Sequence, residues 1–440
     1  MVQLLWIFLG ALFHLTVGFQ GYFWDICDLH LNISNLNYSL ANLGNYKSDS
    51  TILLMKSALI EMKSIYSNPE FIIVNGDNMF HGDAKFNETI VMVSNEIFNI
   101  FSSAIVIPSL GNHDIMPRNV IQNYSPWCNV WYNIWEKYLN NLDPVEIENA
   151  KKGCFYSRTI QSKNGNVLVV VLNTLLWYTR NRLTLNQLDP NDQFKWLEQR
   201  IQYAKNMKIK IFLVGHIPPG TSEYSSIIIE HLHSNFNSRL VDIMQSNYET
   251  IHAGIFAHQH SDAFKVVYNK TNKPVVPIFL APSVTPFRLS TIGSVNPSFR
   301  LYKWSTTAEN SSYDQYHAIL PSSNEKQILA WTKEYSSLEF VPGISAGHLD
   351  KLLSDFASKN STYFNKFFSY HLSGQSHDNA ACPYDSQCRH QFICSMKYVD
   401  YPAFYSCWKQ YSRGVALLFK IEISLILNVI LFIKLFFQDS

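Results

Sequence analysis

Five short polar motifs, each directly after an apolar run with strand character, constrain most strongly how this chain can fold. They are Asp28-Leu29-His30, Gly76-Asp77, Gly111-Asn112-His113-Asp114, Gly215-His216 and His258-Gln259-His260. Ligand sites of α/β sheets gather just beyond the carboxyl ends of the strands. We therefore expect a sheet that brings all five motifs to one edge.

Strand-like apolar runs alternate with amphipathic stretches along most of the chain. The pattern predicts strands at 22–27, 71–74, 104–107, 167–172, 209–214, 251–256 and 275–280, and helices at 51–66, 88–101 and 191–205. This alternation is typical of a layered α/β fold with helices on the outside. Glycines at 343–347 predict a boundary between the main domain and a C-terminal lobe that carries cysteines.

The residue types in the five motifs suit divalent metals. Carboxylate, imidazole and amide oxygen, with no thiolate, favour a catalytic zinc, manganese or iron site over a structural zinc site. Asp28 and His30 are two residues apart, which places both on one side of an extended segment. A carboxylate such as Asp77 can bridge two metals roughly 3.5–4 Å apart. One such motif is usually structural, whereas five in this order indicate a two-metal hydrolytic site.

These motifs resemble those of the calcineurin-like metallophosphoesterase superfamily and, within it, those of the acid sphingomyelinase-like phosphodiesterases. The resemblance includes segments 23–30, 111–119, 172–174, 192–197, 215–220, 282–286 and 296–302. It implies an α/β fold, the metallophosphoesterase β-sandwich flanked by helices, with a small disulfide-bonded helical C-terminal lobe.

The resemblance also implies roles for individual residues. Asp28, His30 and His260 would hold one Zn²⁺. Asn112, His216 and His258 would hold a second, and Asp77 would bridge the two. A hydroxide between the metals would attack phosphorus. His81 and His113 would stabilise the developing charge and protonate the leaving group, and Asp114 would orient His113.

The chain departs at several positions from the motifs of related protein families, and these differences narrow the family to which it can be assigned. Ala257 stands where the superfamily usually has glycine, and a slightly shifted turn is expected there. Phe80 occupies the place of the tyrosine ligand of purple acid phosphatases, and segment 78–80 lacks the arginine of protein Ser/Thr phosphatases. No saposin domain is expected before Asp28, unlike in acid sphingomyelinase itself.

The predicted function is an extracytoplasmic zinc-dependent phosphodiesterase acting on nucleotides or CDP-choline. One alternative is a sphingomyelin phosphodiesterase that releases phosphocholine and ceramide, and another is a non-catalytic surface or lipid-sensing protein. The formal net charge of +1, without a basic run, argues against a nucleic-acid partner. We expect a monomer with a small phosphodiester substrate.

Both termini and several asparagines indicate the secretory pathway. Residues 1–18 are predicted to be a signal peptide, with a buried first strand or helix as the alternative. The apolar tail 412–440 is predicted to be a membrane anchor, either a transmembrane helix or a GPI signal. Secretion, the outer face of the plasma membrane and the lysosome are the expected locations. Acceptor triplets for N-glycosylation occur at Asn32, Asn37, Asn87, Asn123, Asn269, Asn310 and Asn360.

The cysteines favour disulfides over a metal site. Cys382, Cys388, Cys394 and Cys407 lack the Cys-x-x-Cys spacing of a zinc ribbon, so they are predicted to form bridges within the C-terminal lobe. Cys128 and Cys154 can form a third bridge, which leaves Cys27 as a buried free thiol. The expected domains are the catalytic domain at 19–345 and the cysteine-rich lobe at 346–411, between the signal peptide and the tail.

Overall fold

The computed structural model describes residues 20–37, 42–82, 85–162, 165–223, 227–288, 294–305, 307–375, 382–383 and 386–410. The predicted signal peptide and the predicted membrane-anchor tail lie outside these residues. Within the described part of the chain, no helix combines the length and apolar character needed to cross a bilayer.

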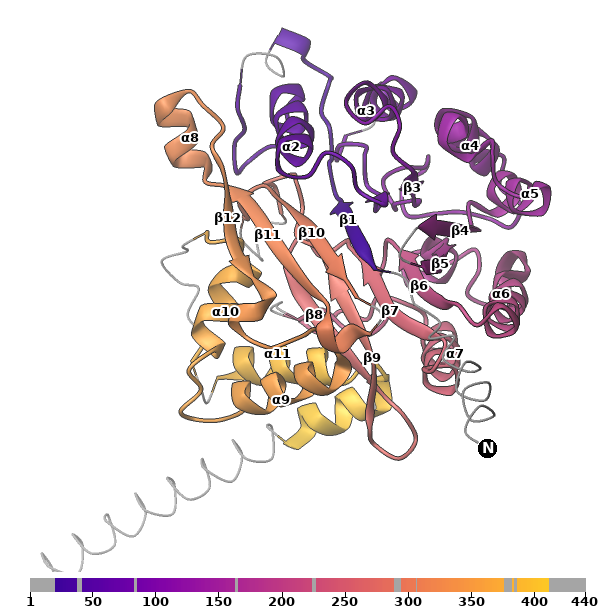
Figure 1. Cartoon of the computed structure of the whole chain (residues 1–440), viewed down its shortest axis with the longest axis vertical. Coiled ribbons are helices and arrows are strands. Elements are labelled where there is room, and N and C mark those ends of the chain that lie inside the picture. The colour runs from indigo at the N-terminus through magenta and orange to yellow at the C-terminus, as the bar shows by residue number, and fades with distance from the viewer. Residues whose placement is uncertain are drawn as a thin grey trace, which may run out of the picture.

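Two six-stranded mixed sheets form the centre of the fold (Figure 1). The first has the order β12-β11-β10-β1-β2-β3, and in it β1, β2 and β3 run parallel. Its strands are β1 (Gly21–Ile26), β2 (Phe71–Val74), β3 (Val106–Pro108), β10 (Ser298–Trp304), β11 (Ser312–Ala318) and β12 (Trp331–Ser336). The second has the order β4-β5-β6-β7-β9-β8, with β5, β6, β7 and β9 parallel. Its strands are β4 (Tyr156–Ser162), β5 (Gly165–Leu172), β6 (Lys210–Gly215), β7 (Ile251–Phe256), β8 (Ala263–Tyr268) and β9 (Pro274–Leu280).

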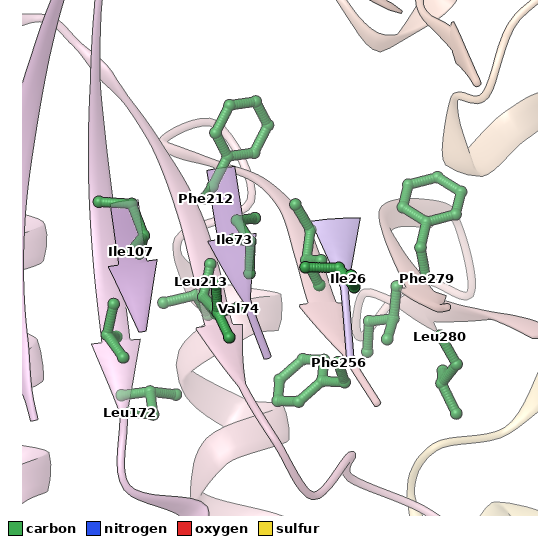
Figure 2. Packing of buried hydrophobic residues seen from close by; sticks show 14 of the residues in the cluster. Ile26, Ile73, Val74, Ile107, Leu172, Phe212, Leu213, Phe256, Phe279 and Leu280 are labelled. Carbon is green, nitrogen blue, oxygen red and sulfur yellow. The ribbon is translucent and has the colours of Figure 1, made fainter. Parts of the chain in front are cut away.

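The two sheets pack face to face through apolar side chains. Figure 2 shows these side chains between strands whose arrowheads point to the same end. The ring of Phe23 in β1 lies 5.4 Å from that of Phe212 in β6, measured between centroids. Because the central parallel strands are buried on both faces, they appear in the sequence as continuous apolar runs. Because these strands also point in the same direction, the carboxyl ends of β1, β2, β3, β6 and β7 meet at one edge of the sandwich.

Helices cover the outside of the sheets (Figure 1). They are α2 (Ile52–Ile65), α3 (Phe86–Ile100), α4 (Pro126–Leu139), α5 (Pro144–Gly153), α6 (Gln193–Met207), α7 (Ser234–Ser246), α8 (Leu320–Lys326), α9 (Ala346–Phe356), α10 (Phe364–His371) and α11 (Gln387–Lys397), and residues 401–410 are helical as well. In α2 the Thr51 side chain caps the first turn, and Met55, Leu59 and Met62 bury one face.

The C-terminal helices pack on the second sheet. The ring of Phe264 in β8 contacts those of Phe356 in α9 and Phe367 in α10, and all three belong to one continuous core. The prediction of a helix-flanked β-sandwich with a disulfide-bonded C-terminal region is confirmed. The boundary at residue 345 stays a prediction.

Some predicted bounds shift for local reasons. The helix expected from residue 191 begins at Gln193, because Asn191 and Asp192 both adopt positive φ. Asp189 accepts hydrogen bonds from the backbone of Phe194 and Lys195 and so caps the helix. The strand expected at 104–107 forms at Val106–Pro108.

Exposure of the predicted glycosylation acceptors varies. Asn37, Asn87, Asn310 and Asn360 are exposed, whereas Asn32, Asn123 and Asn269 are partly buried.

Three disulfides join six of the seven cysteines. They are Cys128–Cys154, Cys382–Cys388 and Cys394–Cys407. Cys27 is buried and free. Cys128 and Cys154, whose pairing the sequence left open, are joined in the structure, and their bridge ties α4 to the end of α5.

Replacing Cys128 and Cys154 together by alanine is expected to lower the free energy of unfolding by about 3.5 kcal/mol, because this bridge restricts the unfolded chain. The two residues are 26 apart in sequence, whereas Cys382 and Cys388 are only 6 apart. Replacing Cys382 and Cys388 by alanine should lower the free energy of unfolding by only about 2 kcal/mol, so this double variant is the matched control. Urea unfolding followed by circular dichroism measures both, and equal losses would contradict this explanation.

Candidate metal centre

The seven predicted ligands lie together just beyond strand ends. Asp28 and His30 follow β1, Asp77 follows β2 and Asn112 follows β3, while His216 follows β6, and His258 and His260 follow β7. Loops of both sheets therefore supply the donor atoms. Residues far apart in the chain meet because the parallel strands of the two sheets end at the same edge.

One group of donors consists of Asp28, His30 and His260. Their donor atoms lie within 4.8 Å of one another. The His260 Nε2 atom is 3.2 Å from the Asp28 Oδ1 atom and 3.2 Å from the His30 Nε2 atom. All three side chains are buried. Such a set of one carboxylate and two imidazoles fits a divalent cation.

A second group of donors consists of Asp77, His216 and His258, again within 4.8 Å of one another. The Asn112 Oδ1 atom lies 3.2 Å from the His216 Nε2 atom. The Asn112 amide nitrogen donates to Asn119, which orients the amide oxygen toward this group. The Asp77 Oδ2 atom is 3.1 Å from the His216 Nε2 atom and 3.5 Å from the His30 Nε2 atom. Asp77 therefore stands between the two groups, where a bridging carboxylate would be placed.

Hydrogen bonds to backbone carbonyls set the proton positions of three imidazoles. The Nδ1 atoms of His30, His216 and His260 lie 2.8, 2.8 and 2.9 Å from the carbonyl oxygens of Met79, Asn75 and Phe287, respectively. A carbonyl only accepts, so each Nδ1 atom carries the proton and donates it. The Nε2 lone pairs then point into the centre, as metal ligation requires.

The backbone of five of the predicted ligands is in the left-handed region. The φ angles are 47° at Asp28, 41° at His30, 52° at Asp77, 74° at His258 and 56° at His260. Such conformations cost roughly 1–3 kcal/mol each in non-glycine residues and cluster at functional sites. Ala257 itself does not have a positive φ, so the alanine is not strained there, whereas the next residue, His258, has φ of 74°.

Two glycines permit the close approach of the Gly-Asp and Gly-Asn-His-Asp loops. A Cβ atom on Gly111 would lie 2.0 Å from the Asp77 backbone nitrogen. Gly76 has φ of +79°, and a Cβ atom there would lie 2.8 Å from the His216 Nδ1 atom. Larger residues would push the Asp77 carboxylate out of place.

Burial and neighbouring charges control protonation in the centre. Burial, assisted by adjacent imidazoles, lowers the pKa of His30 and His258 well below the usual range, so both are neutral. Burial opposes protonation of His216 as well, but Asp77 and Asp28 raise the pKa of His216 to about 9. A metal must displace the proton on His216, so metal binding weakens as the pH falls.

His81 and His113 lie beside the first group. The ring of His81 stacks on His30 with 4.1 Å between centroids, and it lies 4.6 Å from the ring of His113. The His81 Nδ1 atom is 2.7 Å from the Oδ1 atom of Asp49, which also accepts from the His81 backbone at 2.8 Å. Asp49 was not predictable from the sequence, because it belongs to none of the polar motifs and lies in the segment before α2.

Asp114 does not orient His113, so that prediction is wrong. Asp114 accepts hydrogen bonds from the backbone of Asn78, Met79 and Gly111 at 2.7–3.2 Å. The His113 Nδ1 atom has no hydrogen-bond partner among the described residues. Neighbouring residues in this turn point apart, so Asp114 instead holds the loop that carries Asp77.

Replacing Asp49 by asparagine is expected to lower kcat about 10- to 100-fold, because carboxylate partners of active-site imidazoles typically contribute that much. KM should change less, since Asp49 does not line the cleft and reaches it through His81. Steady-state kinetics measures the two separately. A variant in which KM rises while kcat stays constant would contradict an orienting role.

The centre opens into a cleft of about 570 Å³. Four of the predicted ligands and the imidazoles of His81 and His113 line it, together with three arginines, namely Arg118, Arg180 and Arg288. None of the three arginines was predicted to be a site residue. Asp77 is the only carboxylate among the described lining residues. The cleft therefore suits an anionic substrate.

Comparison with known proteins identifies relatives over nearly the whole length. Residues 273–414 match the model of the acid sphingomyelin phosphodiesterase C-terminal region. Acid sphingomyelinase-like phosphodiesterase 3b of Homo sapiens is 30% identical over 420 residues, covering 88% of this chain and 90% of the relative. Cyclic GMP-AMP phosphodiesterase SMPDL3A of Rattus norvegicus is 29% identical, with 89% and 92% covered. Sphingomyelinase phosphodiesterase C of Dictyostelium discoideum is 26% identical, with 88% and 92% covered. The chain thus belongs to the acid sphingomyelinase-like phosphodiesterases, a family of phosphoric ester hydrolases.

Proposed function

We propose that the chain is an extracytoplasmic zinc-dependent phosphodiesterase that cleaves nucleotides or CDP-choline. The observation that carries the proposal is the position of Asp77, whose carboxylate stands between two groups of ligands. Two cations bound there would activate water and neutralise charge on the phosphate. Zinc suits a set of four imidazoles, two carboxylates and one amide better than Mg²⁺ or Ca²⁺ does.

The chain's own residues have separable roles in this proposal. In its doubly protonated form His81 would donate a hydrogen bond from Nδ1 to Asp49 and pass the proton on Nε2 to the leaving group. Burial lowers the pKa of His113 to about 4, so His113 is neutral and acts as a hydrogen-bond donor to the phosphate. Asp114 positions the Asp77 loop.

The charge of the cleft favours nucleotide-type substrates. Among the described residues three arginines and one carboxylate line it, so a substrate with two phosphate groups is attracted more strongly than sphingomyelin, which has a single phosphate. One relative is named a cyclic GMP-AMP phosphodiesterase, which agrees with this preference. Cleavage of sphingomyelin is the second candidate, supported by the name of the Dictyostelium relative and by the matched C-terminal region.

The cellular setting is part of the same proposal. Three disulfides fit an oxidising compartment. The proposed protein has a signal peptide, is glycosylated at the exposed acceptors and is anchored to the membrane by its C-terminal tail. It is a monomer.

Chelation tests whether hydrolysis depends on a metal, and a panel of substrates tests the proposed preference for nucleotides and CDP-choline over sphingomyelin. Dialysis of the purified protein against a chelator is expected to abolish hydrolysis of bis(4-nitrophenyl) phosphate, and Zn²⁺ should restore it where Mg²⁺ does not. CDP-choline, ATP and a cyclic dinucleotide should be cleaved faster than sphingomyelin in detergent micelles. Activity that survives chelation would refute the metal role, and preferential turnover of sphingomyelin would establish the second candidate.

A further inference from the structure

His258 differs from the other three predicted imidazole ligands in how its ring is held. The rings of His30, His216 and His260 each donate a hydrogen bond to a backbone carbonyl oxygen. Within the described part of the chain, the imidazole of His258 forms no hydrogen bond, and the side chain is partly exposed at the cleft. The His258 backbone nitrogen donates to the Asp28 Oδ2 atom at 3.1 Å. Hydrogen bonding therefore fixes the backbone of His258 but not its ring.

The direction of an imidazole ring has to be set by its surroundings. The χ2 angle of histidine is broad and roughly two-fold, so the side chain itself has no sharp preference. At the other three imidazoles the carbonyl acceptors settle this angle. A His258 ring that turned about the same bond would place a carbon atom where the ligating nitrogen has to lie. Neighbouring side chains must therefore prevent this rotation.

Three rings surround the imidazole of His258, and all stand nearly perpendicular to it. Tyr178 lies 5.4 Å away, His216 5.2 Å and His231 5.8 Å, measured between ring centroids. The interplanar angles are 83°, 77° and 87°, respectively. Edge-to-face packing of this kind is a favoured arrangement of rings. Because His216 is itself a predicted ligand, Tyr178 and His231 are the two rings that support His258 from outside the ligand set.

Tyr178 and His231 come from two neighbouring backbone segments that support each other. Tyr178 pairs with Leu232 in an antiparallel bridge, and the Thr179 backbone nitrogen donates to the His231 carbonyl oxygen at 3.0 Å. The Tyr401 hydroxyl donates to the Leu232 carbonyl oxygen at 2.7 Å and accepts from the Leu232 backbone nitrogen at 3.2 Å. Only 4% of Tyr178 and 1% of His231 is exposed. Both rings therefore have fixed positions beside the second group of ligands.

A hydrogen bond also links His231 to the residue next to His258. The Ser222 hydroxyl donates to the Gln259 Oε1 atom at 3.2 Å, so the Gln259 Nε2 atom donates to the His231 Nδ1 atom at 3.4 Å. The Nε2 atom of His231 is buried and has no acceptor among the described residues. A buried donor without a partner lowers stability. The contact with His258 therefore explains a histidine at this position better than a contribution to stability does.

We infer that Tyr178 and His231 are positioning residues, which hold the imidazole of His258 in the direction that lets its nitrogen bind the second metal ion. The inference rests on the proposed function, which supplies the two metals. Ring packing at His258 takes the role that backbone carbonyls have at the other three imidazoles. The ring of Tyr178, and not its hydroxyl group, carries this role.

Zinc titration of the metal-free full-length protein against a chromophoric chelator tests the inference without relying on turnover. The wild type should bind two equivalents. Tyr178→Leu should weaken one of them about 10- to 100-fold, the range typical for loss of a group that orients a metal ligand, and leave the other unchanged. Tyr178→Phe keeps the ring and should bind both equivalents as the wild type does. Tyr203→Leu, at an exposed tyrosine in α6, is the matched control.

The direction of the His258 ring gives a second measurement, which needs no metal. In crystals of metal-free Tyr178→Leu the ring should turn away from the second group of ligands, whereas in the wild type and in Tyr178→Phe it should keep its direction. His231→Leu removes the other supporting ring and should have the same two effects, so it tests the inference if Tyr178→Leu does not fold.

Three results would overturn the positioning role. They are unchanged zinc affinity in the folded leucine variants, equal weakening of both equivalents, and a loss in Tyr178→Phe as large as that in Tyr178→Leu. A wild-type protein that binds fewer than two zinc ions would overturn the proposed function instead. The direction of the His258 ring in the metal-free crystals would still decide the positioning role.

Discussion

Asp77→Ala is expected to lower kcat for bis(4-nitrophenyl) phosphate by at least about 10³-fold, because metal ions at such sites contribute several kcal/mol to the transition state. The Asp77 carboxylate lies 3.1 Å from His216 and 3.5 Å from His30, so its loss affects both groups of ligands. Its Oδ1 atom also accepts a hydrogen bond from the His113 backbone at 2.7 Å. The variant therefore loses both the metal bridge and the support of an active-site loop.

Asp242→Asn is the matched control for this prediction, since Asp242 is an exposed carboxylate in α7. It should retain the wild-type rate. Circular dichroism and thermal unfolding of both variants show that the fold is intact. A folded Asp77→Ala protein with more than about one tenth of the wild-type kcat would contradict a bridging role.

Arg300→Met is expected to lower the free energy of unfolding by about 3–5 kcal/mol, because it leaves buried carboxylates without their counter-charge. Arg300 in β10 is fully buried and donates to Asp262 and Gln315 at 2.6 Å each. It also stands directly opposite Asp25 of β1 in the first sheet. Burial already raises the pKa of Asp25 to about 7 against the opposing effect of Arg300.

Lys366→Met provides the control, because Lys366 forms an ion pair at 2.6 Å with Glu339 on the surface. Exposed pairs contribute at most about 1 kcal/mol, so this variant should unfold nearly as the wild type does. Chemical denaturation measures the free energy of unfolding of both variants. Similar losses in the two variants would show that burial of the Arg300 network adds no stability.

The buried parallel strands were predictable from the sequence. The strands expected at 71–74 and 251–256 form with those bounds, because strands buried on both faces are continuous apolar runs. The strands β10, β11 and β12 were not predicted. They carry polar and charged residues, among them the buried Arg300, whose partners come from distant segments.

The convergence of the seven proposed ligands was predictable to the extent that short motifs mark them. All seven side chains named from the motifs lie at one edge of the sandwich. The orienting contacts were not predictable, because they depend on how separate loops pack. Asp49 reaches His81 across 32 residues of sequence, whereas Asp114, next to His113 in the chain, turns away from it.

Metal analysis of the folded protein tests the central claim most directly. Protein purified from a secretory host without added chelator is expected to contain two equivalents of divalent metal per chain, with zinc predominant. Anomalous scattering from its crystals should place two ions roughly 3.5–4 Å apart, on either side of Asp77. Folded protein that binds no divalent ion after incubation with zinc, or a single ion away from Asp77, would contradict the account.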